Sequence, residues 1–291
     1  MKVLITGAAG LLGRALLDRL QQRGDLELHG IDQRPFPLAT AHLGDLLQPE
    51  FVGKLIAELQ PDQIYHLAGT FSNDFQTDFS SNVATTRLLL DAVVQHQPAA
   101  RLLLIGSAAE YGLVRPEENP IREDHALAPV SMYGWAKVCQ TQLMGYYQRV
   151  RGVDVCMARL FNLSGPASPR LFIGRLYQQI DQLRRGEITE IVTGPLGAVR
   201  DYLAPEAAAE LLEGIMQQGS AGEVYHVASG VPVTMRELMQ QVLHQEGLSD
   251  CKVREETRAL PGKLDIPCIH ADMTKTRDLL RPGQDGAATG G

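Results

Sequence analysis

A tyrosine and a lysine that stand one helical turn apart are the residues of this sequence best suited to acid–base chemistry. Tyr133 and Lys137 lie in the segment Ser-Met-Tyr-Gly-Trp-Ala-Lys, and their i, i+4 spacing puts both side chains on one face of a helix. A phenol with a pKa near ~10 is a poor acid–base catalyst at neutral pH, but an ammonium group one turn away stabilises the phenolate and lowers that pKa. Alone, such a pair is more often a solvated surface pair, so other residues must support the interpretation.

Ser107 is the second candidate, because it ends an apolar run that is typical of a buried strand. The run covers residues 101–106 and continues into Ser107-Ala-Ala-Glu110. In α/β sheets ligands bind at the edge formed by the carboxyl ends of the strands. A serine at that edge could hydrogen-bond the same oxygen that Tyr133 protonates, although a serine at a strand end carries no signal by itself.

Three glycines near the N-terminus predict a dinucleotide site. Gly7, Gly10 and Gly13 follow a first apolar run, residues 2–6, and open an amphipathic helix. In this arrangement the first glycine turns the chain, the second lets the backbone approach a pyrophosphate, and the third lets the helix pack against the strand.

Asp32 stands at the end of the second apolar run, where a carboxylate suits the two ribose hydroxyls of an adenosine. The carboxylate favours NAD(H), because it would repel the 2′-phosphate of NADP(H). Arg34 stands two residues later, where a guanidinium could accommodate that phosphate, so NADP(H) remains an alternative. Asp45 precedes the next helix and is a candidate contact for adenine, although a plain turn aspartate looks the same.

Short apolar runs that alternate with amphipathic stretches surround these residues. This alternation predicts parallel strands with helical crossovers, and the continuously apolar strands are typical of burial on both faces. The fold class is therefore α/β, a Rossmann-type doubly wound parallel sheet with a smaller C-terminal α/β substrate domain. The expected strands are 2–6, 27–31, 63–67, 101–106, 154–160 and 224–228, and the expected helices begin near 11, 49, 82, 131 and 205.

The strand–helix alternation weakens after Asn162 and returns near residue 201. This predicts interleaved domains: 1–163 with 197–229 for the dinucleotide, and 164–196 with 230–282 for the substrate. Residues 283–291 lack an apolar pattern and are expected to form a disordered tail. An apolar stripe with helical spacing is expected in a core and not in a site: Met235, Leu238, Met239, Val242 and Leu243.

The composition argues against nucleic acid and membrane partners. The chain has 27 Lys and Arg against 34 Asp and Glu, a net charge of −7, without the basic surface that a phosphate backbone requires. No apolar run approaches the ~18 residues of a membrane span, and no signal-peptide pattern follows Met1, so a cytoplasmic protein is expected. The four cysteines form no C-x-x-C pair, and no acidic or histidine cluster supports His66 or His125 as a ligand, so no metal is expected.

Together these motifs resemble the extended short-chain dehydrogenase/reductase family, which includes NAD-dependent nucleotide-sugar epimerases, dehydratases and reductases. The resemblance extends to about residue 280. It implies a nicotinamide cofactor, a nucleotide-sugar substrate and a homodimer. Segments 106–112, 121–134, 198–202 and 222–230 are most similar to the reductases that convert GDP-4-keto-6-deoxy-D-mannose to GDP-D-rhamnose. The other motifs are His66–Gly69, Asn82–Thr86, Arg159–Asn162, Gly165-Pro166 and Val199–Tyr202.

The resemblance also implies roles for single residues. Tyr133 would be the proton donor, Lys137 would hold the ribose and tune the tyrosine, and Ser107 would bond the reacting oxygen. Arg200 would clamp the diphosphate, the structural alternative being an ion pair with Asp201. Cofactor contacts are implied for Gly7, Gly10, Leu11, Leu12, Gly13, Asp32, Asp45, Leu46, Leu67, Ala68, Gly69, Tyr133, Lys137 and Phe161, and substrate contacts for Thr70, Ser107, Glu110, Asn162, Arg175 and Arg200.

Absent residues narrow the reaction within the family. The related 4,6-dehydratases use a glutamate two positions before the tyrosine of the serine motif, and the fucose-forming epimerase-reductases use a cysteine there. This chain has Ala109 at that position. A 4-ketoreductase remains, or a C4 epimerase that keeps its NAD tightly bound. A non-catalytic NAD(H)-sensing relative is a third hypothesis, which the intact set of Ser107, Tyr133 and Lys137 disfavours.

Overall fold

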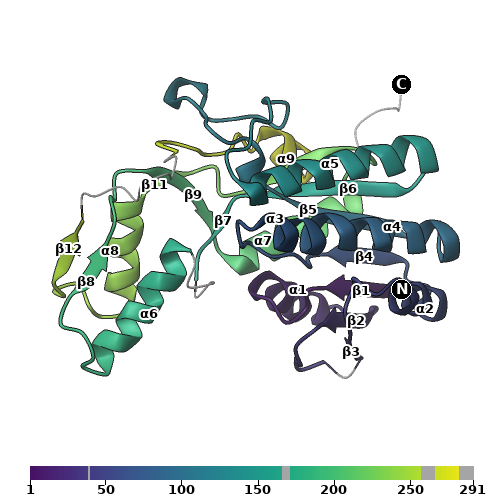
Figure 1. Ribbon diagram of the computed structural model, residues 1–291, viewed down its shortest axis with the longest axis horizontal. Coiled ribbons are helices and arrows are strands. Elements are labelled where there is room, and N and C mark those ends of the chain that lie inside the picture. The colour runs from purple at the N-terminus through teal and green to yellow at the C-terminus, as the bar shows by residue number, and fades with distance from the viewer. Residues whose placement is uncertain (39, 166–170, 257–265, 282–291) are drawn as a thin grey trace, which may run out of the picture.

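Seven parallel strands form the central sheet of the computed structural model, which describes residues 1–38, 40–165, 171–256 and 266–281 (Figure 1). The strand order is β10-β6-β5-β4-β1-β2-β3, and each neighbouring pair is parallel. The predicted Rossmann-type doubly wound sheet is therefore confirmed. The strands are β1 (Lys2–Thr6), β2 (Glu27–Asp32), β3 (Ala41–Leu43), β4 (Gln63–His66), β5 (Arg101–Ser107), β6 (Asp154–Leu160) and β10 (Val224–Val227).

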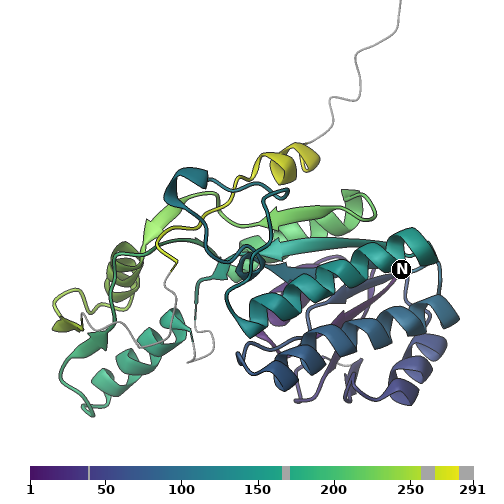
Figure 2. The ribbon, with the colours of Figure 1, turned by 45° about the horizontal axis from the view of Figure 1, so that its top comes forward.

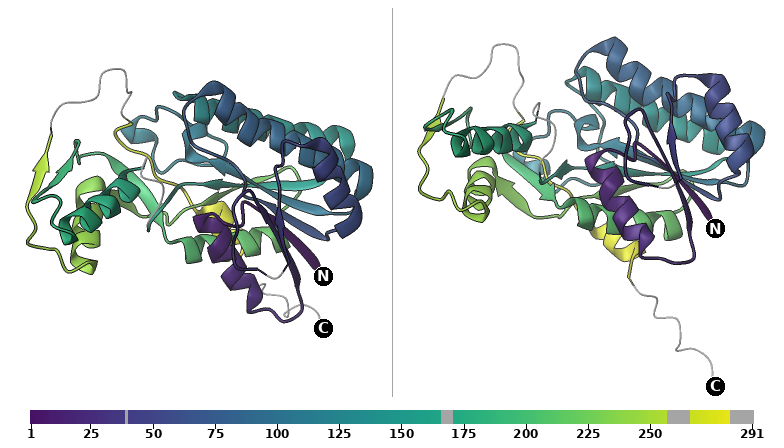
Figure 3. Two further views of the ribbon diagram at one scale, coloured as in Figure 1. Left: turned by 60° about the horizontal axis from the view of Figure 1, so that its bottom comes forward. Right: turned by 90° about the horizontal axis from the view of Figure 1, so that it is seen from below.

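Helices cover both faces of this sheet, as the views in Figures 2 and 3 show. On one face lie α1 (Leu11–Gln21) and α7 (Pro205–Gln218). On the other face lie α2 (Pro49–Leu59), α4 (Thr85–His96) and α5 (Met132–Arg151). The sheet therefore has two hydrophobic interfaces, one on each side.

Strand β5 shows why the strands are apolar at every position. Leu103 and Ile105 pack with α1 and α7, whereas Leu102 and Leu104 pack with α2, α4 and α5. Successive side chains of a strand point to opposite faces, and here both faces are buried.

The strand order changes direction at β1, which places the predicted ligand residues at one edge. From β1 the chain forms β2 and β3 on one side and β4 on the other. In open α/β sheets ligands bind outside the carboxyl ends of the strands at this point. In Figure 1 this edge faces the smaller group of elements.

That smaller group contains α6 (Phe172–Arg184), α8 (Met235–Gln245) and a parallel pair of strands, β8 (Ile191–Thr193) and β12 (Val253–Glu255). These elements share a hydrophobic core of their own, which contains the predicted apolar stripe with Leu238, Met239, Val242 and Leu243 buried and Met235 at its border. The buried members of this core all fall within the ranges 164–196 and 230–282, where the substrate domain stays a prediction.

A three-stranded sheet connects the two groups of elements. Strand β9 (Val199–Leu203) pairs in parallel with β7 (Asn162–Leu163) and antiparallel with β11 (Pro232–Thr234). Because β7 follows β6 directly, the end of the central sheet leads straight into this second sheet. A last helix, α9 (Thr274–Leu279), packs near β10.

Several short elements differ from the sequence prediction. Strands β3, β7, β11 and β12 have two or three residues each, too few to show an apolar period. The helix expected from residue 82 is preceded by α3 (Phe75–Asp78) and a π-helical turn, Phe79–Ala84, and becomes α-helical only at α4. The predicted tail at 283–291 lies outside the described residues. In the part of the chain that the structure describes, no helix is long and apolar enough to cross a membrane, and the cytoplasmic location stays a prediction.

Candidate active site

The turn after β1 is packed so closely that a side chain would not fit at two of its glycines. Gly7 has a φ of +71°, and a Cβ on it would lie 2.8 Å from the amide nitrogen of Ala68. A Cβ on Gly13 would lie 2.3 Å from the carbonyl oxygen of Gly7. The turn therefore lies directly against the loop after β4, and α1 lies directly against the turn.

The first turn of α1 is open to an anion. Gly10 is its N-cap and offers no side chain to the helix N–H groups, and the first turn contains no acidic residue. Free N–H groups at a helix N-terminus attract phosphate. Leu11 is half-buried and Leu12 is buried, so their backbone is what this turn offers to a ligand. These features fit the pyrophosphate of a dinucleotide.

Asp32 is fixed beside this turn. Its carboxylate accepts hydrogen bonds from the backbone N–H groups of Ala9 at 3.1 Å and of Arg34 at 3.0 Å. The Arg34 guanidinium lies 3.7 Å from the same carboxylate, and its side chain is 72% exposed. The negative charge is therefore held at the end of β2, while the positive charge of Arg34 extends into solvent.

Asp45 and Leu46 lie close to Asp32, because the N–H of Gly44 donates to the Asp32 carbonyl at 3.2 Å. The Asp45 carboxylate accepts a hydrogen bond from the N–H of Leu47 at 2.9 Å, and Leu46 is buried. Asp45 thus caps its own turn while standing next to the predicted adenosine position.

Helix α5 brings Tyr133 beside Ser107 at the end of β5. Ser131 begins the helix by accepting a hydrogen bond from the Gly134 N–H at 3.0 Å. Removal from water raises the pKa of Tyr133 to about 12, although the hydrogen bond with the Ser107 side chain acts in the opposite direction. The ring of Phe71 stands edge-on against the Tyr133 ring, with centroids 5.1 Å apart. The phenol is therefore protonated at neutral pH and enclosed on one side.

Lys137 lies one turn further along α5 and is 4% exposed. Its ammonium group donates to the carbonyl of Ile105 at 2.8 Å and to Oε1 of Gln140 at 2.9 Å. Two of its three protons are thus used, and the third remains for a ligand. Burial lowers the pKa of Lys137 to about 8, against the raising effect of the negative charges of Glu110 and Asp78.

Buried uncharged side chains connect Lys137 to the turn after β1, and we call them the neutral cluster: Thr6, His66, Thr86 and Gln140. The Thr86 hydroxyl donates to the Asn82 carbonyl at 2.6 Å, so it accepts from Nε2 of Gln140 at 2.8 Å and from Nε2 of His66 at 3.0 Å. Nδ1 of His66 then accepts from the Thr6 hydroxyl at 2.8 Å. Burial and the charge of Lys137 lower the pKa of His66 to about 3, so the ring is neutral.

The loop after β4 lies between these two sites. The N–H of Ala68 donates to Oγ1 of Thr6 at 3.1 Å, which joins the loop to the neutral cluster. The hydroxyl of Thr70, which is exposed, shares a hydrogen bond with Ser81 at 2.6 Å. The predicted cofactor residues of this loop are Leu67, Ala68 and Gly69. Leu67 and Ala68 lie next to Gly7, and a Cβ on Gly69 would lie 3.6 Å from Nζ of Lys137.

The predicted residues after β6 lie partly inside the protein. The ring of Phe161 is buried against His226 and Tyr111, with centroids at 5.2 Å and 6.5 Å, so only its backbone lies toward the sheet edge. Asn162 follows in β7, where its side-chain amide donates to the Asp201 carbonyl at 3.0 Å.

Arg200 and Arg175 come from different elements. Arg200 lies in β9 and donates to the carbonyl of Val199 at 2.8 Å, and Arg175 is exposed on α6. The carboxylate of Asp201 is buried and accepts hydrogen bonds from the N–H and hydroxyl of Ser229 at 2.8 Å and 2.7 Å. Asp201 therefore fixes the turn after β10.

Glu110, which the sequence predicts at the substrate, lies in the interior instead. One carboxylate oxygen accepts from the Ser107 N–H at 2.7 Å, and the other from the Thr141 hydroxyl at 2.7 Å and Nη2 of Arg159 at 2.9 Å. Arg159 also donates to the Tyr111 hydroxyl at 2.8 Å. A carboxylate with no exposed surface and both oxygens bonded to protein donors does not contact a ligand. We call this set the charged cluster: Glu110, Thr141, Arg159 and Tyr111.

Sequence reasoning missed most members of the two clusters. Gln140 stands three residues after Lys137 on the same helix face, which is a usable signal. Thr86 and Thr141 look like ordinary helix residues, and Phe71 like a loop residue. Their roles depend on the packing of separate elements against one another.

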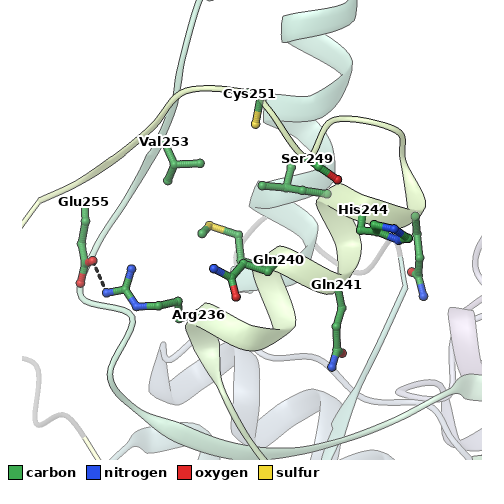
Figure 4. A pocket seen from close by; sticks show the side chains of 11 residues that line it. Arg236, Gln240, Gln241, His244, Ser249, Cys251, Val253 and Glu255 are labelled. Carbon is green, nitrogen blue, oxygen red and sulfur yellow. Dashed lines mark hydrogen bonds and ion pairs between the residues drawn. The ribbon is translucent and has the colours of Figure 1, made fainter.

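A separate cavity of about 760 Å³ lies between α8 and β12 (Figure 4). Arg236 and Glu255 form an ion pair of 2.5 Å at one end of it. The cavity contains none of the predicted site residues. Across the described ranges of the chain, no group of three or more His, Cys, Asp or Glu is placed to hold a metal ion.

The model of the NAD dependent epimerase/dehydratase family matches residues 3–228. This chain belongs to that family. It is 29% identical over 248 residues to the GDP-6-deoxy-D-mannose reductase of Pseudomonas aeruginosa, covering 82% of this chain and 78% of the relative. It is 26% identical to the UDP-glucose 4-epimerase of Streptococcus mutans, covering 96% and 91%. The solved structure of RMD from Pseudomonas aeruginosa complexed with NADPH is 25% identical, with a TM-score of 0.83 and coverage of 96% and 92%.

Membership of the epimerase/dehydratase family makes this chain an NAD(P)-dependent oxidoreductase of the short-chain dehydrogenase/reductase type. The expectations of an enzyme and of a nicotinamide cofactor are therefore confirmed. The matched region contains the glycine turn, Ser107, Tyr133 and Lys137, and it ends just after β10.

Proposed function

We propose that this enzyme uses NAD(P)H to reduce the C4 keto group of a nucleotide 4-keto-6-deoxyhexose, converting GDP-4-keto-6-deoxy-D-mannose to GDP-D-rhamnose. The observation that carries the proposal is the assembly of Ser107, Tyr133 and Lys137 with Ala109 at the position of the elimination base. The two carboxylates whose charges act on Tyr133, Glu110 and Asp78, are both buried. A ketone reduction needs a proton donor and no carboxylate base, which fits this set.

The side chains would divide the work as follows. Tyr133, protonated at neutral pH, gives its proton to the sugar O4, and Ser107 hydrogen-bonds the same oxygen and orients it. The third proton of the Lys137 ammonium group binds the cofactor ribose, and its positive charge stabilises the phenolate that forms. When bound, the nicotinamide would supply the hydride to C4, and the proton from Tyr133 completes the reduction of the ketone.

NAD(H) is the proposed cofactor, with NADP(H) as the alternative. The Asp32 carboxylate is anchored by two backbone N–H groups, so it stays where a 2′-phosphate would lie. Replacement of Asp32 by Ser should raise kcat/KM for NADPH and lower it for NADH, whereas Asp25→Ser, on the loop before β2, should change neither. The assignment would be contradicted if the ratio of kcat/KM for NADPH to that for NADH were the same in Asp32→Ser as in the wild type.

The substrate would lie between the central sheet and the smaller group of elements. Arg200 is the proposed clamp for the diphosphate, since a guanidinium can bridge two phosphate oxygens. Asn162, Thr70 and Arg175 are the other proposed contacts in the described part of the chain. Arg200→Ala should therefore raise the KM for the nucleotide sugar while leaving NADH binding unchanged.

The deciding experiment measures nicotinamide oxidation, with NADH and NADPH separately, on a panel of nucleotide 4-keto-6-deoxysugars that includes the GDP-mannose derivative. Stoichiometric oxidation of the cofactor with one sugar supports the reductase and identifies the nucleotide base of its substrate. Sugar isomerised without consumption, by enzyme purified with bound NAD, makes the chain a C4 epimerase. Cofactor binding without any turnover points to the non-catalytic alternative.

Tyr133→Phe is the matching variant. It removes only the hydroxyl, so turnover should fall by roughly a hundredfold or more while NADH still binds. Phe71→Leu is the control. It leaves the Tyr133 hydroxyl in place and replaces only the ring that packs against it, so the variant should keep most of its activity. An active Tyr133→Phe enzyme would contradict the assigned role.

We also propose a homodimer, as the family resemblance implies. Trp135 and Phe75 are 42% and 51% exposed and lie 5.8 Å apart between ring centroids, on α5 and α3. Phe79 extends this aromatic surface. Sedimentation equilibrium should give twice the monomer mass. Trp135→Glu should lower that mass, whereas Gln240→Glu on α8 should not.

A further inference from the structure

The ion pair between Glu110 and Arg159 is closed to water directly behind Ser107. The two side chains are 0% and 2% exposed, and Oε2 of Glu110 lies 2.9 Å from Nη2 of Arg159. A buried ion pair of this kind is weak evidence for stability, because apolar side chains of similar volume often serve the fold as well. Its place next to a reacting side chain points to a role in the reaction.

Glu110 fixes the backbone of Ser107 through a capping box. Its Oε1 accepts from the Ser107 N–H at 2.7 Å, and the Ser107 hydroxyl oxygen accepts from the Ala109 N–H at 3.2 Å. With one lone pair used in this way, the hydroxyl keeps its proton and its other lone pair for Tyr133 and the reacting oxygen. Gly106 provides the space, since a Cβ there would lie 2.6 Å from Oε1 of Glu110.

We infer that Glu110 is a positioning residue of the reaction, which holds Ser107 in place and, paired with Arg159, acts as a negative charge on Tyr133 and Lys137. The inference rests on the proposed function, in which Ser107 and Tyr133 act on the sugar carbonyl. It replaces the substrate contact that the sequence predicts for Glu110, because the carboxylate has no exposed surface.

The charge of Glu110 acts on the two catalytic side chains in the same direction. It raises the pKa of Tyr133 and also that of Lys137, which keeps the phenol protonated and the amine charged. These are the states that a proton donor and a ribose-binding cation need. The ionisable groups near Glu110 are Arg159 on β6, Tyr111 beside it, and Glu123 and His226 beyond Arg159. Asp78 also acts on Tyr133 and Lys137, and His66 interacts with Lys137.

Two substitutions separate the charge from the contact. Glu110→Gln keeps the length of the side chain and removes the charge. Glu110→Asp keeps the charge and the pairing with Arg159, but it is one methylene too short to reach the Ser107 N–H. Glu123→Gln is the matched control, because Glu123 is also largely buried and bonds the N–H of His226 on the far side of Arg159.

The main measurement is NADH affinity as a function of pH, followed by NADH fluorescence. In the wild type the affinity should fall as pH rises through about 8, where Lys137 loses its proton. In Glu110→Gln this fall should begin at lower pH, whereas Glu110→Asp and Glu123→Gln should keep the wild-type profile. In the reductase assay kcat should fall roughly tenfold to a hundredfold in both Glu110 variants and stay unchanged in Glu123→Gln.

Two results would overturn the inference: the same pH profile in Glu110→Gln as in the wild type, or wild-type kcat in Glu110→Asp. If Glu110→Gln does not fold because Arg159 loses its partner, the kcat of Glu110→Asp decides. Thr141→Val, which removes one donor to the carboxylate, should then also lower kcat. NADH binding requires no turnover. A wild type that reduces no 4-keto sugar therefore contradicts the proposed function and leaves the affinity test of Glu110 in force.

Discussion

The neutral cluster and the charged cluster both lie beneath the reacting side chains, but they are built in different ways. The neutral cluster holds Lys137 through hydroxyl, imidazole and amide groups whose donors and acceptors pair one by one. The charged cluster holds Ser107 through a carboxylate and a guanidinium removed from water. One side chain is thus positioned without any added charge, and the other with a full ion pair.

This difference predicts how much stability each cluster loses when one of its side chains is replaced. In the neutral cluster, loss of one partner leaves a buried polar group unsatisfied, which costs the desolvation of that group. In the charged cluster, loss of one partner leaves a buried charge, which costs more. The neutral cluster also needs a neutral His66, whose pKa burial and the charge of Lys137 lower to about 3, so its stability depends on acid pH.

Arg159→Leu should have the largest effect on stability. It leaves the Glu110 carboxylate charged and unpaired in the interior, so the free energy of unfolding should fall by about 3–5 kcal/mol. Urea denaturation measures this. Arg254→Leu is the control, because Arg254 is 51% exposed and pairs with Glu190 at the surface, and it should cost less than ~1 kcal/mol. Equal losses in both variants would show that an unpaired charge in the charged cluster costs no more than one at the surface.

Thr86→Val should have the next largest effect. It removes the oxygen that accepts hydrogen bonds from His66 and Gln140, and the free energy of unfolding should fall by about 1–3 kcal/mol. The neighbouring Thr85 is also buried, but its hydroxyl donates only to the Ser81 carbonyl one turn earlier, so Thr85→Val removes a single local bond and should cost under ~1 kcal/mol. A larger loss in Thr85→Val than in Thr86→Val would contradict the network.

His66 should make stability depend on acid pH. Its pKa is about 3 in the folded protein and ~6.5 in the unfolded chain, so the unfolded chain binds the proton first as pH falls. The contribution is complete above pH ~6.5 and should be lost at up to about 1.4 kcal/mol per pH unit below it. Urea denaturation between pH 7 and 5 should show a smaller slope for His66→Gln than for the wild type, with His244→Gln on α8 as control.

Gln140→Leu should have the smallest effect. It removes one acceptor of the Lys137 ammonium, so the pKa of Lys137 should fall below about 8 and NADH affinity should decline from a lower pH, by less than one unit. Gln142→Leu, exposed on the same helix, should leave the profile unchanged. If the two variants behave alike, Gln140 does not stabilise the charge.

The parts of the site that the sequence predicts are those whose partners lie close in the chain. The glycine turn spans seven residues, and Tyr133 and Lys137 are four residues apart, so the local geometry of a turn or a helix places them. The sheet is equally predictable from the sequence, because strands buried on both faces are apolar at every position. Asp32 follows from its place at the end of a strand.

The parts that the sequence does not predict are those that depend on distant partners. Glu110, in the turn after β5, pairs with Arg159 on β6, and His66 on β4 bonds Thr86 on α4. No periodicity links such positions, so Glu110 reads equally well as a residue that faces the substrate. Strands β3, β7, β11 and β12 are missed for a related reason, since their pairing is set by neighbours and not by their own residues.

Gly106 has a consequence for how this enzyme can diverge. A Cβ at this position would lie 2.6 Å from Oε1 of Glu110 and 2.7 Å from the sulfur of Met157, so any other residue requires both side chains to move and disturbs the hydrogen bond of the carboxylate with the Ser107 N–H. Positions 106 and 110 are therefore expected to change together. Lineages that carry alanine or serine at 106 are expected to have lost the glutamate at 110, and with it this way of holding the serine.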